Sequence, residues 1–173
     1  MLHGHRARSS VVLTVAALAA SVGLLISYVP PGTAAPQTAP PASQPDVPAA
    51  DVVQPEDLAK AIAGKDRPIV VCVAPRFLYD GAHVPGALFH GPGSTEAGLA
   101  DLRQWAQGVP HDANIVLYCG CCPMTRCPNI RPAYRALREL GFEHIRVLNI
   151  PTNMHEDWFS KGYPAETGSP SAG

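Results

Sequence analysis

The sequence predicts an α/β domain with a parallel β-sheet of four or five strands and helices on both faces. Short apolar runs, mostly of β-branched residues, alternate with segments of helical periodicity, and this alternation is typical of parallel sheets. The clearest runs cover residues 68–73 and 114–118. Both are apolar on both faces, as expected of strands buried in the middle of such a sheet.

The other elements follow from apolar spacing and from residues that begin or end helices. Pro55 suits the first turn of a helix, Ser94 suits an N-cap, and Gly64 and Gly141 are expected to end helices. We therefore predict further strands at 51–53, 87–89 and 145–148. We predict helices at 55–63, 76–80, 95–107, 129–140 and 154–161.

The N-terminus has the order of features found in export signals. A short cationic start precedes an uncharged apolar run at 11–29, and small residues follow at Thr33 and Ala35. Residues 1–35 are therefore predicted to be a secretory signal peptide or, given the length of the apolar run, an N-terminal membrane anchor. Either alternative places the rest of the chain outside the cytoplasm, in the periplasm or an equivalent compartment, and the second tethers it through 11–29.

Composition divides the remainder of the chain into three parts. Residues 36–50 form a Pro/Ala-rich stretch that we expect to be a semi-rigid linker. Residues 51–168 hold the predicted domain, and residues 169–173 are expected to be a disordered tail. The formal net charge of the 173 residues is -1, which gives no basic field for nucleic acid, so no nucleic-acid partner is expected.

Four of the five cysteines fall within the nine residues 119–127, directly after the predicted strand at 114–118. Disulfides within so short a loop would restrain the unfolded chain very little, so the cluster favours chemistry or metal binding over stabilisation. Cys119 lies between a strand end and a helix start, where backbone N–H groups are expected to lower its pKa and favour the thiolate. Arg126 and Arg131 would attract an anionic substrate.

Several segments, in their order along the chain, resemble the rhodanese-like domains, a family of sulfurtransferases. The most specific are GAHVPGA (81–87) and IVLYC (115–119). Residues 53–64, 68–73, 133–148 and 158–164 match the family's opening helix, central strand, helix–strand pair and closing Trp and Gly-Tyr-Pro. The resemblance spans about residues 51–168 and implies a rhodanese-like fold.

The resemblance also implies a reaction. Cys119 would be the nucleophile that takes the outer sulfur of thiosulfate or a similar donor as a persulfide. A thiol acceptor, which includes a redox partner protein, or cyanide would then remove that sulfur. The surrounding loop would assist. Arg76 would replace an arginine that the family usually has at the end of the strand corresponding to residues 68–73. The auxiliary residues are Gly120, Cys121, Cys122, Met124, Thr125, Arg126, Cys127 and Arg76. No cofactor is implied.

The loop departs from the family pattern, and this leaves alternatives open. It is about five residues longer than usual, and Cys121, not Cys119, has the usual spacing to Arg126, which makes Cys121 a rival nucleophile. The spare thiols would also suit a thiol–disulfide or sulfur-relay protein. A third alternative is a non-catalytic module with local disulfides or with zinc or a soft copper ion. The vicinal pair Cys121–Cys122 does not match paired Cys-x-x-Cys zinc spacing, so we assign no metal ligand.

Overall fold

The structure, a computed structural model, describes residues 47–168. The predicted signal or anchor at 1–35, the first part of the linker and the tail at 169–173 lie outside the described residues. Within residues 47–168 no helix is both long enough and apolar enough to cross a membrane.

The described chain forms a five-stranded, fully parallel sheet, which confirms the predicted α/β class. The strands are β1 (Val52–Val53), β2 (Ile69–Cys72), β3 (Leu88–Phe89), β4 (Ile115–Tyr118) and β5 (Ile145–Leu148). Their order is β1-β5-β4-β2-β3, so β4 is the central strand. All four residues of β4 are buried, as the run of apolar side chains predicts.

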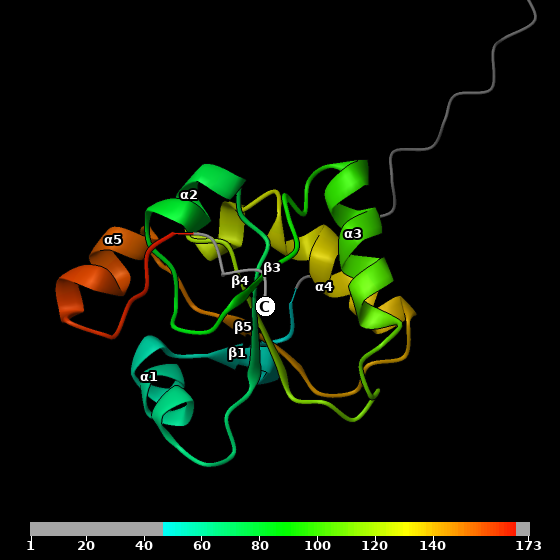
Figure 1. The fold of residues 1–173 in the computed structure, drawn as a ribbon, viewed down its shortest axis with the longest axis horizontal. Helices are drawn as coiled ribbons and strands as arrows, with labels where there is room; N and C mark the ends of the chain where they lie inside the picture. Colours follow the sequence, from blue (N-terminus) through cyan, green and yellow to red (C-terminus); the bar gives the residue numbers. More distant parts are fainter. Residues whose placement is uncertain (1–46, 169–173) are drawn as a thin grey trace, which may run out of the picture. The chain divides into compact units, whose positions relative to one another are not determined.

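Helices cover both faces of the sheet (Figure 1). They are α1 (Pro55–Ala63), α2 (Arg76–Gly81), α3 (Glu96–Ala106), α4 (Ile130–Glu139) and α5 (Met154–Asp157), with short 3-10 turns at Ala49–Asp51, Met124–Arg126 and Phe159–Lys161. Figure 1 shows α1 and α5 on one side of the sheet and α3 and α4 on the other. Helices therefore lie over both faces of the sheet, and the four residues of the central strand are buried.

Two predicted helix boundaries are wrong. Thr95, not Ser94, is the N-cap of α3, and its hydroxyl oxygen accepts a hydrogen bond from the Gly98 N–H at 3.1 Å. The backbone N–H of Ser94 instead donates to a side chain of the neighbouring α4 segment. The predicted last helix stops at Asp157, because Trp158 leaves helical geometry before the 3-10 turn.

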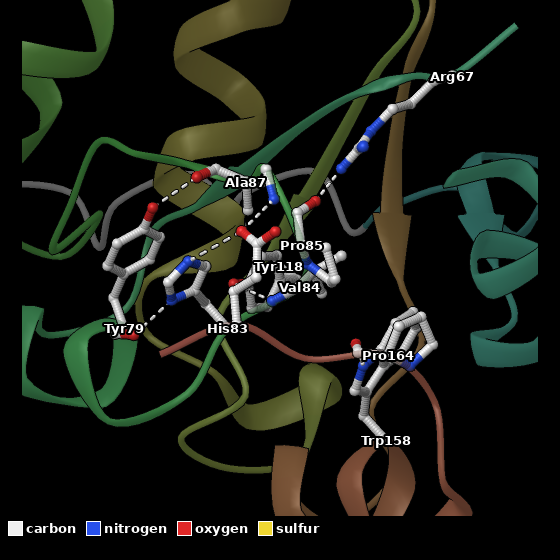
Figure 2. A network of polar contacts seen from close by, with 11 residues as sticks. Arg67, Tyr79, His83, Val84, Pro85, Ala87, Tyr118, Trp158 and Pro164 are labelled. Carbon is white, nitrogen blue, oxygen red and sulfur yellow. Dashed lines mark hydrogen bonds and ion pairs between the residues drawn. The ribbon is translucent and has the colours of Figure 1, made fainter. Parts of the chain in front are cut away.

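The segment 81–87, which is the GAHVPGA motif, is held by hydrogen bonds and ring stacking with neighbouring side chains (Figure 2). The His83 ring stacks on that of Tyr79, with centroids 3.9 Å apart, and its Nδ1 donates to the Tyr79 carbonyl at 2.8 Å. The Tyr79 hydroxyl donates to the Ala87 carbonyl at 2.6 Å, and the Val84 N–H donates to the Tyr118 hydroxyl at 3.3 Å. His83 therefore has a structural role, and the segment braces the end of β4.

A second set of contacts ties the same segment to the C-terminal part of the domain. The Glu166 carboxylate accepts a hydrogen bond from the Gly86 N–H at 2.8 Å and lies 3.8 Å from Nε2 of His83. The Arg67 guanidinium donates to the Pro85 carbonyl. Residues far apart in the sequence thus hold the wall beside Tyr118, the last residue before the cysteine loop.

Candidate active site

The cysteine loop begins where β4 ends, at the carboxyl edge of the sheet, which is where parallel sheets usually bind ligands. Cys119 follows Tyr118 directly and is 4 % exposed. The loop then turns through the 3-10 segment and reaches α4 at Ile130. The predicted location of Cys119, between a central strand and a helix, is confirmed.

Two backbone contacts hold the loop against the segment that follows β5. The Met154 N–H donates to the Gly120 carbonyl at 3.0 Å, and the Met124 N–H donates to the Ile150 carbonyl at 2.7 Å. Gly120 has a φ of 75°, a left-handed conformation in which L side chains are strained, and a Cβ there would lie 2.7 Å from the Met154 Cβ. Glycine is therefore required at the first turn of the loop.

The loop brings three sulfur atoms together. The Sγ atoms of Cys119, Cys121 and Cys127 all lie within 4.8 Å of one another. The Cys119–Cys121 separation is 3.2 Å and the Cys121–Cys127 separation is 4.0 Å. Cys122 contacts Cys121, with the two sulfurs 3.2 Å apart, and also Cys127, but it lies outside the group of three. All five cysteines, which lie within the described residues, are free thiols.

The backbone N–H groups at the start of α4 lower the pKa of Cys127 and not that of Cys119. The predicted lowering of the Cys119 pKa is therefore wrong. A hydrogen bond with Cys119 lowers the pKa of the Cys127 thiol to about 5, and the backbone N–H groups of Asn129 and Ile130 add to that effect. The contact with Cys127, together with burial, raises the pKa of Cys119. The helix start therefore favours the thiolate form of Cys127.

Asn129 is a site residue that the sequence analysis did not identify. Its side chain is buried, its Nδ2 donates to the Cys119 Sγ at 3.2 Å, and its Oδ1 accepts from the Ser94 N–H at 3.0 Å. An Asn at the start of a helix suggests a cap, but this side chain makes no capping bond to α4. The Cys-Pro-Asn sequence marks the position, whereas only the fold turns the amide toward Cys119.

Replacing Asn129 is expected to slow the reaction of Cys119 with iodoacetamide at neutral pH. Asn129→Asp keeps the oxygen that accepts from Ser94 but removes the donor to Cys119 and adds a negative charge beside it. Because Cys119 reacts only as its thiolate, and a hydrogen bond to a charged group contributes roughly 1.5–3 kcal/mol, we expect alkylation to slow about tenfold or more. Peptide mass spectrometry measures the rate at Cys119. An unchanged rate in folded Asn129→Asp would show that the amide does not stabilise the thiolate.

A cavity of about 510 Å³ opens beside Cys119 and Cys121. Its wall is mainly apolar and aromatic and comes from α2, the end of β4 and the α5 segment. Phe77, an exposed aromatic side chain, lies at this cavity, and Met154 and His155 contribute from α5. Among the residues that the structure describes, no arginine lines the cavity. It therefore presents a thiol pair to a ligand with an apolar part.

Most of the other predicted auxiliary residues do not line this cavity. Met124 and Thr125 line a separate cavity of about 280 Å³ on another part of the loop, and Arg126 is exposed. Arg76 pairs with Asp80 at 3.1 Å and packs over the Phe89 ring at 4.6 Å. Gly120 lines the main cavity, whereas Cys122 and Cys127 do not.

Comparisons with known proteins agree with the fold. No protein-family model and no curated protein matches the sequence. Among solved structures, the rhodanese-like domain of the Alr3790 protein from Anabaena is 21% identical, with 71% of this chain and 86% of that chain covered and a TM-score of 0.51. The BH2092 protein from Bacillus halodurans is also 21% identical, with 66% and 75% covered and a TM-score of 0.52.

A third solved structure is a variant of EanB in complex with ergothioneine that is covalently linked with a persulfide cysteine. It is 18% identical, with 70% of this chain and 33% of that chain covered and a TM-score of 0.52. Identities this low show a shared fold. Together with the all-parallel five-stranded sheet and the cysteine at the end of its central strand, they show that this chain has the rhodanese-like fold.

Proposed function

We propose that the protein is a sulfurtransferase that carries sulfane sulfur as a persulfide on Cys119. The observation that carries the proposal is the position of this thiol. It follows the central strand, faces the main cavity and receives a hydrogen bond from the Asn129 amide. An amide donor and the open cavity are what a reactive sulfur needs for stabilisation and for access.

The first step forms one S–S bond and breaks another. The Cys119 sulfur attacks the outer sulfur of a donor, and its proton passes to the neighbouring Cys127 sulfur. With thiosulfate the leaving group is sulfite, and with an organic persulfide it is the organic thiolate. In the second step an acceptor thiolate attacks the outer sulfur of the Cys119 persulfide and leaves as a new persulfide, so that Cys119 returns as a thiolate. No net oxidation of the protein occurs.

The cavity favours an organic donor or acceptor. Its aromatic and apolar wall matches the carbon part of a thiol compound, and the described arginines lie outside it. A small dianion such as thiosulfate would lack a guanidinium partner there. We therefore propose a low-molecular-weight organic persulfide as the better donor. Export through residues 1–35 and a thiol partner outside the cytoplasm are parts of the same proposal.

Mass spectrometry of the reduced protein after exposure to a donor tests this function. We expect a gain of one sulfur atom, more complete with glutathione persulfide than with thiosulfate. Trypsin cuts after Arg126, so it separates Cys127 from the other loop cysteines, and fragmentation places the sulfur on Cys119. A protein whose mass stays that of the reduced form with both donors is not a sulfurtransferase and would instead be a binding module.

The 3.2 Å separation between the Cys119 and Cys121 sulfurs favours a second candidate, a sulfur relay that ends in a disulfide. The Cys121 thiolate would attack the inner sulfur of the Cys119 persulfide, form the Cys119–Cys121 disulfide and release hydrosulfide. An external dithiol would then reduce the disulfide. In the same experiment this reaction gives a mass loss of two hydrogens in place of a gain of sulfur.

A further inference from the structure

The cluster of Cys119, Cys121 and Cys127 has the composition of a soft-metal site. Three thiols from one loop converge, with all Sγ atoms within 4.8 Å of one another and with separations of 3.2 Å for Cys119–Cys121 and 4.0 Å for Cys121–Cys127. Metal–thiolate bonds of roughly 2.3 Å place the sulfurs of a trigonal site roughly 4 Å apart. The loop therefore already has nearly the spacing that one metal ion with three thiolate ligands requires.

The number of sulfurs distinguishes between the metals that thiolates select. Structural zinc takes four ligands in a tetrahedron, whereas Cu(I) belongs to the soft ions that thiolates favour. Cys122 adjoins Cys121 and Cys127, but it is excluded from the group of sulfurs that all lie within 4.8 Å of one another. A fourth thiolate is thus not in place, and a three-sulfur set favours Cu(I).

The surroundings support a metal held at this point. Cys119 and Cys127 are buried, while Cys121 is exposed, so the ion has an entry path at one corner of the triangle. The Asn129 Nδ2 lies 3.2 Å from the Cys119 sulfur and 3.9 Å from the Cys121 sulfur. Hydrogen bonds of this kind to ligating atoms orient them and offset part of their negative charge.

We propose that Cys119, Cys121 and Cys127 bind one Cu(I) ion. Each thiol that coordinates as a thiolate releases its proton to solvent, and the copper stays in the +1 state. Because the ion occupies the Cys119 sulfur, copper binding and persulfide formation at this residue exclude each other. The proposal does not depend on sulfur transfer, since it rests on the separations of the three sulfurs.

The test is an anaerobic titration of the reduced full chain with Cu(I), buffered by a competing chelator such as bicinchoninate. We expect one Cu(I) per chain, three sulfur neighbours by X-ray absorption, and protection of Cys119 from alkylation. Cys121→Ser and Cys127→Ser should each weaken binding about tenfold or more. The matched control is Cys122→Ser, which removes the adjacent thiol and should leave the affinity unchanged.

Three outcomes would overturn the proposal. One is a chain that does not compete with the chelator for Cu(I). Another is equal weakening in Cys122→Ser and Cys127→Ser, which would indicate a different donor set. The third is full affinity in Cys127→Ser, which would mean that the adjacent thiols bind copper adventitiously. Cys121 is exposed, so Cys121→Ser stays interpretable if the buried Cys127→Ser does not fold. It should lose copper affinity but still form the Cys119 persulfide.

Discussion

Cys119→Ser is expected to reduce sulfur transfer to below about one-thousandth of the wild-type rate, with the fold intact. A serine hydroxyl stays protonated at neutral pH and cannot form a persulfide, whereas it occupies nearly the same volume as the thiol. The Asn129 amide that donates to the Cys119 sulfur can donate to the serine oxygen instead. The rate of thiocyanate formation from cyanide measures the loss, and circular dichroism checks the fold.

Cys121→Ser is the matched variant for this experiment, because Cys121 lies at the same cavity and is the rival nucleophile. We expect it to keep at least about a tenth of the wild-type rate, since the attacking sulfur is still present. If Cys121→Ser abolishes transfer and Cys119→Ser does not, the two cysteines have the opposite roles. Equal loss in both variants would indicate that sulfur passes from one to the other.

Trp158→Ala is expected to have the largest effect on stability. The side chain is fully buried, its Nε1–H donates to the Pro164 carbonyl at 2.8 Å, and its ring packs against Tyr163 with centroids 5.1 Å apart. Truncating a buried tryptophan leaves a large void and costs about 3–5 kcal/mol. Urea unfolding should show a loss of this size in the free energy of unfolding.

Trp158→Phe separates the two contributions of this residue. Phenylalanine keeps most of the buried ring but cannot donate to Pro164, so we expect a loss of about 1–3 kcal/mol for the unpaired carbonyl and the smaller ring. The backbone N–H of Trp158, which both variants keep, donates to the Met154 carbonyl, and Met154 packs on Gly120 of the cysteine loop. A loss below about 1 kcal/mol in Trp158→Ala would show that the ring does not support the core.

The sequence was sufficient for the elements and for the location of Cys119. Continuous apolar runs identify β2 and β4, because a strand buried on both faces has no polar side to interrupt it. The cysteine that directly follows β4 must then lie at the carboxyl edge of the sheet. The helix boundary at α3 needed the structure: Ser94 and Thr95 are both good caps, and Thr95 caps the helix while the Ser94 N–H donates to Asn129.

The sequence by itself determined that a cysteine-rich loop follows a central parallel strand and precedes a helix, because these features depend on neighbouring residues. Only the tertiary structure decided that the Cys127 sulfur lies beside that of Cys119, that Cys122 lies outside the three-sulfur group, and that the Asn129 amide faces the Cys119 thiol. These arrangements depend on contacts between distant segments, such as Met124 with Ile150 and Gly120 with Met154. Spacing along a chain does not specify such contacts, since a loop of eleven residues, 119–129, can close in many ways until the rest of the fold holds it.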